Sequence, residues 1–114
     1  MIFTSLEAEK DLRETGYNIV YAFPDNFETL PAVSFYTANE TPVYSTSALF
    51  SERATVVVDV WVHEDDEPLT GEMCGKIDSV MYEKGWFREY SADVPDRDSR
   101  VNHHTMRFTK FFKE

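Results

Sequence analysis

The sequence predicts an α+β fold, a two-layer sandwich in which a mixed, mostly antiparallel β-sheet carries one long helix across it and a short N-terminal helix. Three observations predict this class. Residues 54–62 are largely apolar on both faces of a strand, as in a central strand. Residues 67–84 carry an apolar stripe at helical spacing. Four further segments have strand character, which sets the expected order α-β-β-β-α-β-β.

Residues 5–15 are predicted to form the short N-terminal helix. Thr4 and Glu7 have the spacing of a capping box, and Gly16 stands where a left-handed residue commonly ends a helix. Because apolar positions are few, we expect this helix at the edge of the fold. Those positions are Leu6, Ala8 and Leu12.

Two strands are expected next, over residues 17–23 and 32–37. The first is rich in apolar, β-prone residues and ends at Pro24-Asp25-Asn26, which favours a turn. The second begins after Pro31, at a position where no backbone donor is required.

Residues 38–52 are predicted to be a long loop, because they combine Ser, Thr and Pro. Their apolar residues are unusual for a solvated loop. These either pack back onto the core or meet another subunit, and the sequence favours neither alternative. They are Val43, Tyr44, Leu49 and Phe50.

The strand at residues 54–62 has two distinct faces. We expect a helix over one face and more protein, or a partner, over the other. One face holds Val56, Val58, Val60 and Val62, and the other holds Thr55, Val57, Asp59 and Trp61.

The long helix is predicted to begin near residue 67 and to end at Gly85. The acidic residues 64–67 and Pro68 suit the start of a helix, where the macrodipole is positive. Residues 86–91 and 100–112 should then pair as a hairpin, with Met106, Phe108 and Phe112 on one face. The apolar stripe of the helix is Leu69, Met73, Ile77, Val80 and Met81.

Length and charge limit the classes of function. A chain of 114 residues suits one domain, 1–114, and 42% hydrophobic residues argue against disorder. A net charge of -10 disfavours binding to DNA or to an anionic membrane, and no apolar run approaches the roughly 20 residues of a membrane span. The start lacks the pattern of a secretory signal, and the single cysteine predicts a reducing cytoplasm.

The sequence offers no recognisable catalytic, metal or cofactor motif. Cys74 lies inside the long helix, where a free cysteine is usually a packing residue. His103 and His104 are adjacent on a strand and therefore point to opposite faces, and His63 beside residues 64–66 lacks the spacing of an established site. We therefore expect no enzyme activity and no cofactor.

Asp59 is the most unusual residue, because a carboxylate within a valine-rich strand needs hydrogen bonds or an ion pair. A catalytic role is one reading. A structural ion pair with Arg53, Arg88, Arg107 or a neighbouring subunit's cation is the favoured reading.

The second half of the chain resembles the small siphophage and prophage proteins that cap the tail tube, the tail-terminator or tail-to-head joining family. The resemblance covers roughly residues 30–112 and depends on element order and local character. The segments that carry it are the strand 53–61, the helix 69–84 with Lys76-Ile77-Asp78-Ser79-Val80-Met81, Gly85-Trp86-Phe87-Arg88, Val94-Pro95-Asp96 and His103-His104-Thr105-Met106-Arg107-Phe108.

The resemblance implies a ring, typically a hexamer, that sits on the tail tube, ends its polymerisation and meets the head-completion or connector proteins. DNA would pass through without specific binding, and the protein would reach the virion tail after assembly in the bacterial cytoplasm. Another phage neck or minor tail component is one alternative, and a stand-alone ligand-binding or regulatory domain is a second. The expected interface residues are Val43, Tyr44, Leu49, Phe50, Asp59 and Trp61.

Overall fold

The computed structural model describes residues 4–24, 30–45, 48–95 and 100–113, and for residues 44, 45, 48–50 and 113 it describes the backbone only. The expected α+β class and element order are confirmed. The elements are α1 (Thr4–Leu12), a 3-10 turn (Arg13–Thr15), β1 (Ile19–Tyr21), β2 (Ala32–Ser45), β3 (Ala48–His63), a second 3-10 turn (Glu64–Asp66), α2 (Glu67–Glu83), β4 (Phe87–Val94) and β5 (Val101–Lys113).

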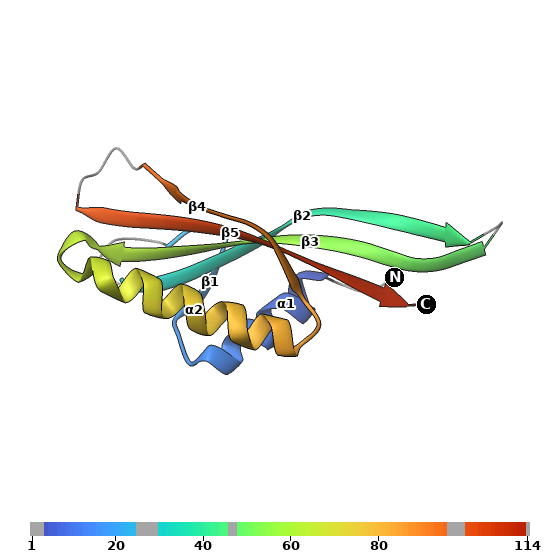
Figure 1. Cartoon of the computed structure of the whole chain (residues 1–114), viewed down its shortest axis with the longest axis horizontal. Coiled ribbons are helices and arrows are strands. Elements are labelled where there is room, and N and C mark those ends of the chain that lie inside the picture. Colours follow the sequence, from blue (N-terminus) through green and yellow to red (C-terminus); the bar gives the residue numbers. More distant parts are fainter. Residues whose placement is uncertain (1–3, 25–29, 46–47, 96–99, 114) are drawn as a thin grey trace.

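The five strands form one sheet in the order β1-β2-β3-β5-β4. β1 pairs with β2 in parallel, and the other three pairs are antiparallel, so the sheet is mixed and mostly antiparallel as expected. β3 is the central strand. Both helices lie on the same side of this sheet (Figure 1), which makes the predicted two-layer sandwich.

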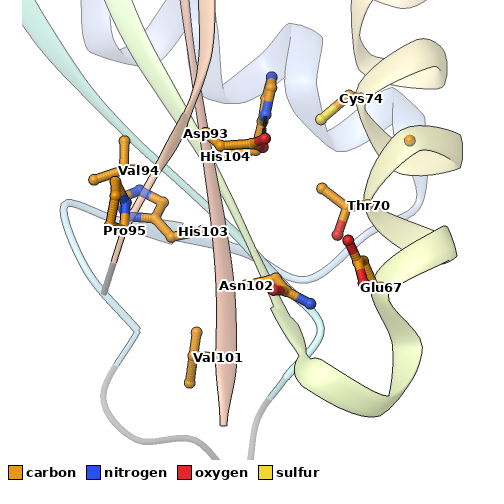
Figure 2. Close-up of a pocket in the computed structure, with 11 residues that line it drawn as sticks. Glu67, Thr70, Cys74, Asp93, Val94, Pro95, Val101, Asn102, His103 and His104 are labelled. Carbon is orange, nitrogen blue, oxygen red and sulfur yellow. Dashed lines mark hydrogen bonds and ion pairs between the residues drawn. The ribbon is translucent and has the colours of Figure 1, made fainter. Parts of the chain in front are cut away.

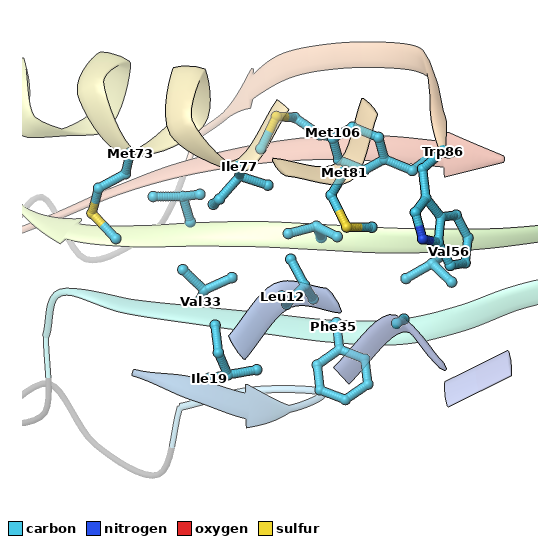
Figure 3. Close-up of a cluster of buried hydrophobic side chains, with 14 of the residues drawn as sticks. Leu12, Ile19, Val33, Phe35, Val56, Met73, Ile77, Met81, Trp86 and Met106 are labelled. Carbon is cyan, nitrogen blue, oxygen red and sulfur yellow. The ribbon is translucent and has the colours of Figure 1, made fainter. Parts of the chain in front are cut away.

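The core lies between β3 and α2 (Figure 3). The predicted stripe of α2 is confirmed, because Met73, Ile77 and Met81 are fully buried. Each such side chain contributes about 1.5–3 kcal/mol through removal of apolar surface from water. Their partners on the sheet are also fully buried: Val33, Val56, Val58, Val60, Val62, Met106 and Phe108.

α1 packs its Ala8 and Leu12 into this core, whereas Leu6 is 58% exposed. A buried hydrogen bond ties the helix down, since Trp86 Nε1 donates to Asp11 Oδ2 at 2.9 Å. The turn after α1 ends at Gly16, whose φ of 81° is the left-handed conformation that the sequence predicted.

The predicted loop at residues 38–52 is wrong, because this segment belongs to two long paired strands. β2 and β3 pair from Ala32↔Trp61 to Ser45↔Ala48, with register shifts after Thr37 and Val43. Thr, Val and Tyr favour strands, and pairing satisfies the backbone groups of both segments. Pro42 is tolerated because no described strand pairs with β2 on its other side there.

We call residues 39–45 and 48–53 the hairpin arm. The arm extends beyond the helices (Figure 1) and helps to make the molecule 53 Å long but only 25 and 21 Å across.

The sheet face opposite the helices, which we call the open face, has no helix over it in the described part of the chain. It carries Thr55, Val57, Asp59 and Trp61, which are nevertheless only 3% to 7% exposed. Neighbouring strands bury them, because a central strand is crowded by side chains from both sides. The expected helix cover is thus confirmed for one face of β3, and a partner on the other face stays a prediction.

Candidate functional site

The adjacent histidines of β5 lie on opposite faces of the sheet, as the sequence predicted. His103 is opposite Trp61 in the register, on the open face, and His104 is opposite Val60, on the helix face. Each imidazole contacts a different carboxylate, so the two rings do not converge on one ion.

On the open face, His103 is the partner of Asp59. His103 Nε2 donates to Asp59 Oδ1 at 2.8 Å, and the two side chains are only 12% and 6% exposed. The His103 ring also stacks on Trp61, with centroids 3.7 Å apart and an angle of 13°. Trp61 Nε1 in turn donates to Ser34 Oγ at 2.9 Å. The buried polar groups therefore satisfy one another.

The expectation of an arginine partner for Asp59 within the chain is wrong. Arg88 lies 3.4 Å from Asp78, and Arg107 lies over the ring of Tyr90. Arg53 stands six residues before Asp59 on the same strand, too far along β3 to pair with it. Histidine replaces arginine here because β5 places residue 103 diagonally across from Asp59 on the same face. The close partner supports the structural reading of Asp59, and it limits what Asp59 offers a second chain.

The expected interface residues of the hairpin arm pair with each other as backbone. Tyr44 is opposite Leu49, and Val43 is opposite Ser51. Val43 is partly buried, whereas the side chains of Tyr44, Leu49 and Phe50 lie outside the described part of the chain. Their contacts with another subunit stay a prediction.

The sequence reasoning missed three exposed aromatic residues on the open face. Phe87, Tyr90 and Phe111 are 54%, 52% and 53% exposed. Their register partners Thr109, Arg107 and Arg53 place them on that face. Finding them required the register of β4 with β5, which includes a shift between Arg88 and Tyr90.

A cleft of about 540 Å³ lies between the first half of α2 and the ends of β4 and β5 (Figure 2). We call it the α2–β4 cleft. The sequence did not predict it. Its walls include Glu67, Thr70, Cys74, Asp93, Asn102 and His104.

A serine, a histidine and an aspartate form a chain of hydrogen bonds at the margin of this cleft. Ser91 Oγ lies 2.6 Å from His104 Nε2, and His104 Nδ1 lies 2.7 Å from Asp93 Oδ1. This is the connectivity of a hydrolytic triad. However, the Asp93 side chain is 90% exposed, and Ser91 is also exposed. A solvated carboxylate lacks the water-excluded setting that gives such groups their catalytic strength. We therefore interpret these hydrogen bonds as a structural link between β4 and β5.

Cys74 is a poor nucleophile in this cleft. Burial raises the pKa of its thiol to about 11, the negative charge of Asp93 adds to the rise, and Arg88 opposes it. The thiol therefore stays protonated at neutral pH, and the thiolate that attacks electrophiles is scarce. Two other atoms of the cleft walls, Thr70 Oγ1 and Asn102 Nδ2, are buried and have no hydrogen-bond partner among the described residues.

The described residues hold no cluster of metal-binding side chains and no membrane-spanning helix. No three or more His, Cys, Asp or Glu side chains among them are grouped so as to hold a metal ion, and His63 with residues 64–66 makes no such group. None of the helices in that part of the chain has the length and apolarity to cross a membrane.

Comparison with known proteins adds no family. No protein-family model matches the chain, and no curated protein matches it.

Proposed function

We propose that this chain is a structural subunit of a phage or prophage tail, a tail-terminator protein that forms a ring on the tail tube. It ends polymerisation of the tube and provides the joint to the head-completion proteins. The resemblance in element order suggests this family, and the hairpin arm is the single observation that carries a role in assembly.

The end of the hairpin arm has only two strands. β5 pairs with β3 as far as Ser51↔Lys113, so beyond that point residues 44 and 45 have only residues 49 and 48 as described partners. A two-stranded hairpin is at best marginally stable in water and gains stability when it packs on other protein. This end of the arm contains four apolar or aromatic residues, whose exposure to solvent is unfavourable. They are Val43, Tyr44, Leu49 and Phe50. A second copy of the chain would cover them.

Two further surfaces suit repeated association. The outer edge of β2 has no described strand beside it from Tyr36 onward, since β1 pairs only with residues 33–35. The open face carries Phe87, Tyr90 and Phe111, each more than half exposed. Aromatic side chains of this kind often anchor protein interfaces. A ring needs two different complementary surfaces on each copy. The outer edge of β2 and the open face are two such candidate surfaces.

The acidic charge fits a DNA channel. With a net charge of -10, the chain repels a phosphate backbone, so DNA would pass a ring of such subunits without sticking to it.

A stand-alone ligand-binding domain is the second candidate, and the α2–β4 cleft is the observation that favours it. Its volume of about 540 Å³ falls within the range of small-molecule sites. Another phage neck or minor tail protein would share the assembly surfaces described above.

The test is the assembly state of a variant with a charged arm. Leu49→Asp together with Phe50→Asp should convert oligomers to monomers and leave the fold intact, because both positions lie where only β2 and β3 form the arm. The matched control is Leu6→Asp with Tyr82→Asp, which also replaces two apolar residues by carboxylates but at exposed helical positions. Sedimentation velocity compares the two. Unchanged oligomers in the arm variant, or equal loss in the control, would refute the role of the arm.

A further inference from the structure

β4 has one unpaired edge. It is the last strand of the sheet, Phe87–Val94, and seven of its eight residues pair with β5 on one side only, while Glu89 falls at a register shift. On the other side, no described strand meets its outward N–H and C=O groups. Such an edge is a template for an additional strand, and extended peptides bind proteins in this way.

The α2–β4 cleft lies beside the same strand. Asp93 and Val94, the last residues of β4, and Pro95 after them form one wall, and α2 forms the opposite wall (Figure 2). Side chains of a bound strand alternate between the two faces of the sheet. A strand added to β4 would therefore direct every second side chain to the helix face, where the cleft can receive one.

The charge of the cleft favours a cationic side chain. Glu67 and Asp93 are exposed carboxylates on opposite walls, and no Lys or Arg is among the described residues that line the cleft. Thr70 and Asn102 add a buried hydroxyl oxygen and a buried amide nitrogen that find no partner in the described part of the chain, and a polar ligand can satisfy them.

We propose that β4 and the α2–β4 cleft bind an extended segment of a partner protein, which pairs with the outer edge of β4 and places a Lys or Arg side chain between Glu67 and Asp93. The backbone pairing supplies affinity, and the cleft supplies selection for the basic residue. The overall negative charge of the chain also speeds encounter with basic partners. This site goes beyond the proposed tail function, because it does not require a ring.

The first experiment selects ligands for the intact wild-type protein from an mRNA-displayed library of random heptapeptides. The expected result is enrichment of peptides with one Lys or Arg flanked by β-branched or aromatic residues. Recovery of peptides without a basic preference, or failure to recover any, overturns the proposal.

The second experiment measures the affinity of the strongest recovered peptide by calorimetry. Glu67→Gln and Asp93→Asn should each weaken binding about twofold to fivefold, as expected for a partly exposed ion pair, and together about tenfold. Asn at position 93 keeps an oxygen that accepts from His104, so the β4–β5 link survives. Glu72→Gln is the control, because Glu72 is an exposed carboxylate of α2 that does not line the cleft. An equal loss of peptide affinity in the Glu72→Gln control contradicts the proposed position of the site.

Backbone pairing is tested with N-methylated forms of the same peptide. One form carries methyl groups on the odd-numbered amides and the other on the even-numbered amides. One form should lose binding and the other should keep it, because only every second amide of the added strand faces β4. Equal binding of the two methylated peptides refutes edge pairing. Butylamine, which carries the cation without a backbone, should bind at least a hundredfold more weakly than the peptide. Binding of similar strength would instead assign the cleft to small amines and overturn the peptide proposal.

Discussion

Substitution of Asp59 and His103, singly and together, tests whether their pair is structural. His103→Phe keeps a ring to stack on Trp61 but leaves a buried carboxylate without its partner, which costs about 3 kcal/mol or more. Asp59→Val leaves a nearly buried imidazole N–H without an acceptor and should cost about 1–3 kcal/mol. The double variant removes both polar groups, so we expect its stability within about 1 kcal/mol of the wild type.

The assay is urea unfolding followed by circular dichroism at one fixed protein concentration, because association would otherwise shift the apparent stability. The double variant should be more stable than either single variant, which gives a favourable coupling energy between the two residues. Its assembly state should equal that of the wild type. Additive losses from the two single substitutions would show that Asp59 and His103 do not stabilise one another, and a specific loss of assembly would show that the pair serves an interface.

Three further predictions concern the helical layer. Asp11→Ala should lower stability by about 1–3 kcal/mol because the buried Trp86 N–H loses its acceptor, whereas Asp11→Asn should cost less; equal losses in thermal unfolding would contradict this. Gly16→Ala should destabilise the fold by about 1–2 kcal/mol, because the φ of residue 16 is 81°. Gly75→Ala inside α2 should stabilise it by about 0.5–1 kcal/mol, because an added Cβ meets open space there. Effects of the same sign would refute the backbone argument. Alkylation of Cys74 by iodoacetamide should accelerate up to about pH 11, because the thiolate forms only as the pH approaches its raised pKa, and a plateau near pH 8.5 would show an unperturbed thiol.

The regular parts of the fold follow from local patterns. The apolar stripe of α2, the two faces of β3 and the left-handed turn at Gly16 each depend on spacing or on one residue type, and all were predicted correctly. The hairpin arm was missed for a physical reason. Its Ser, Thr and Pro residues favour a loop when they are read alone, and the strand conformation becomes favourable only through pairing of β2 with β3.

The candidate sites depend on register, which local patterns do not determine. The link from Ser91 to His104 to Asp93 exists because β4 and β5 align Asp93 with His104. The partner of Asp59 depends in the same way on the alignment of β3 with β5. A one-residue slip would move every one of these side chains to the other face. The opposite orientation of the two histidines needed only the alternation within one strand, and it was predicted correctly.

Electron microscopy of the purified wild-type chain, with its mass in solution measured up to about millimolar concentration, tests the central claim most directly. If the chain acts by covering its two-stranded arm with further copies, the images will show closed rings with a central hole, and the solution mass will be a fixed multiple of the monomer. A monomer at every concentration would contradict it.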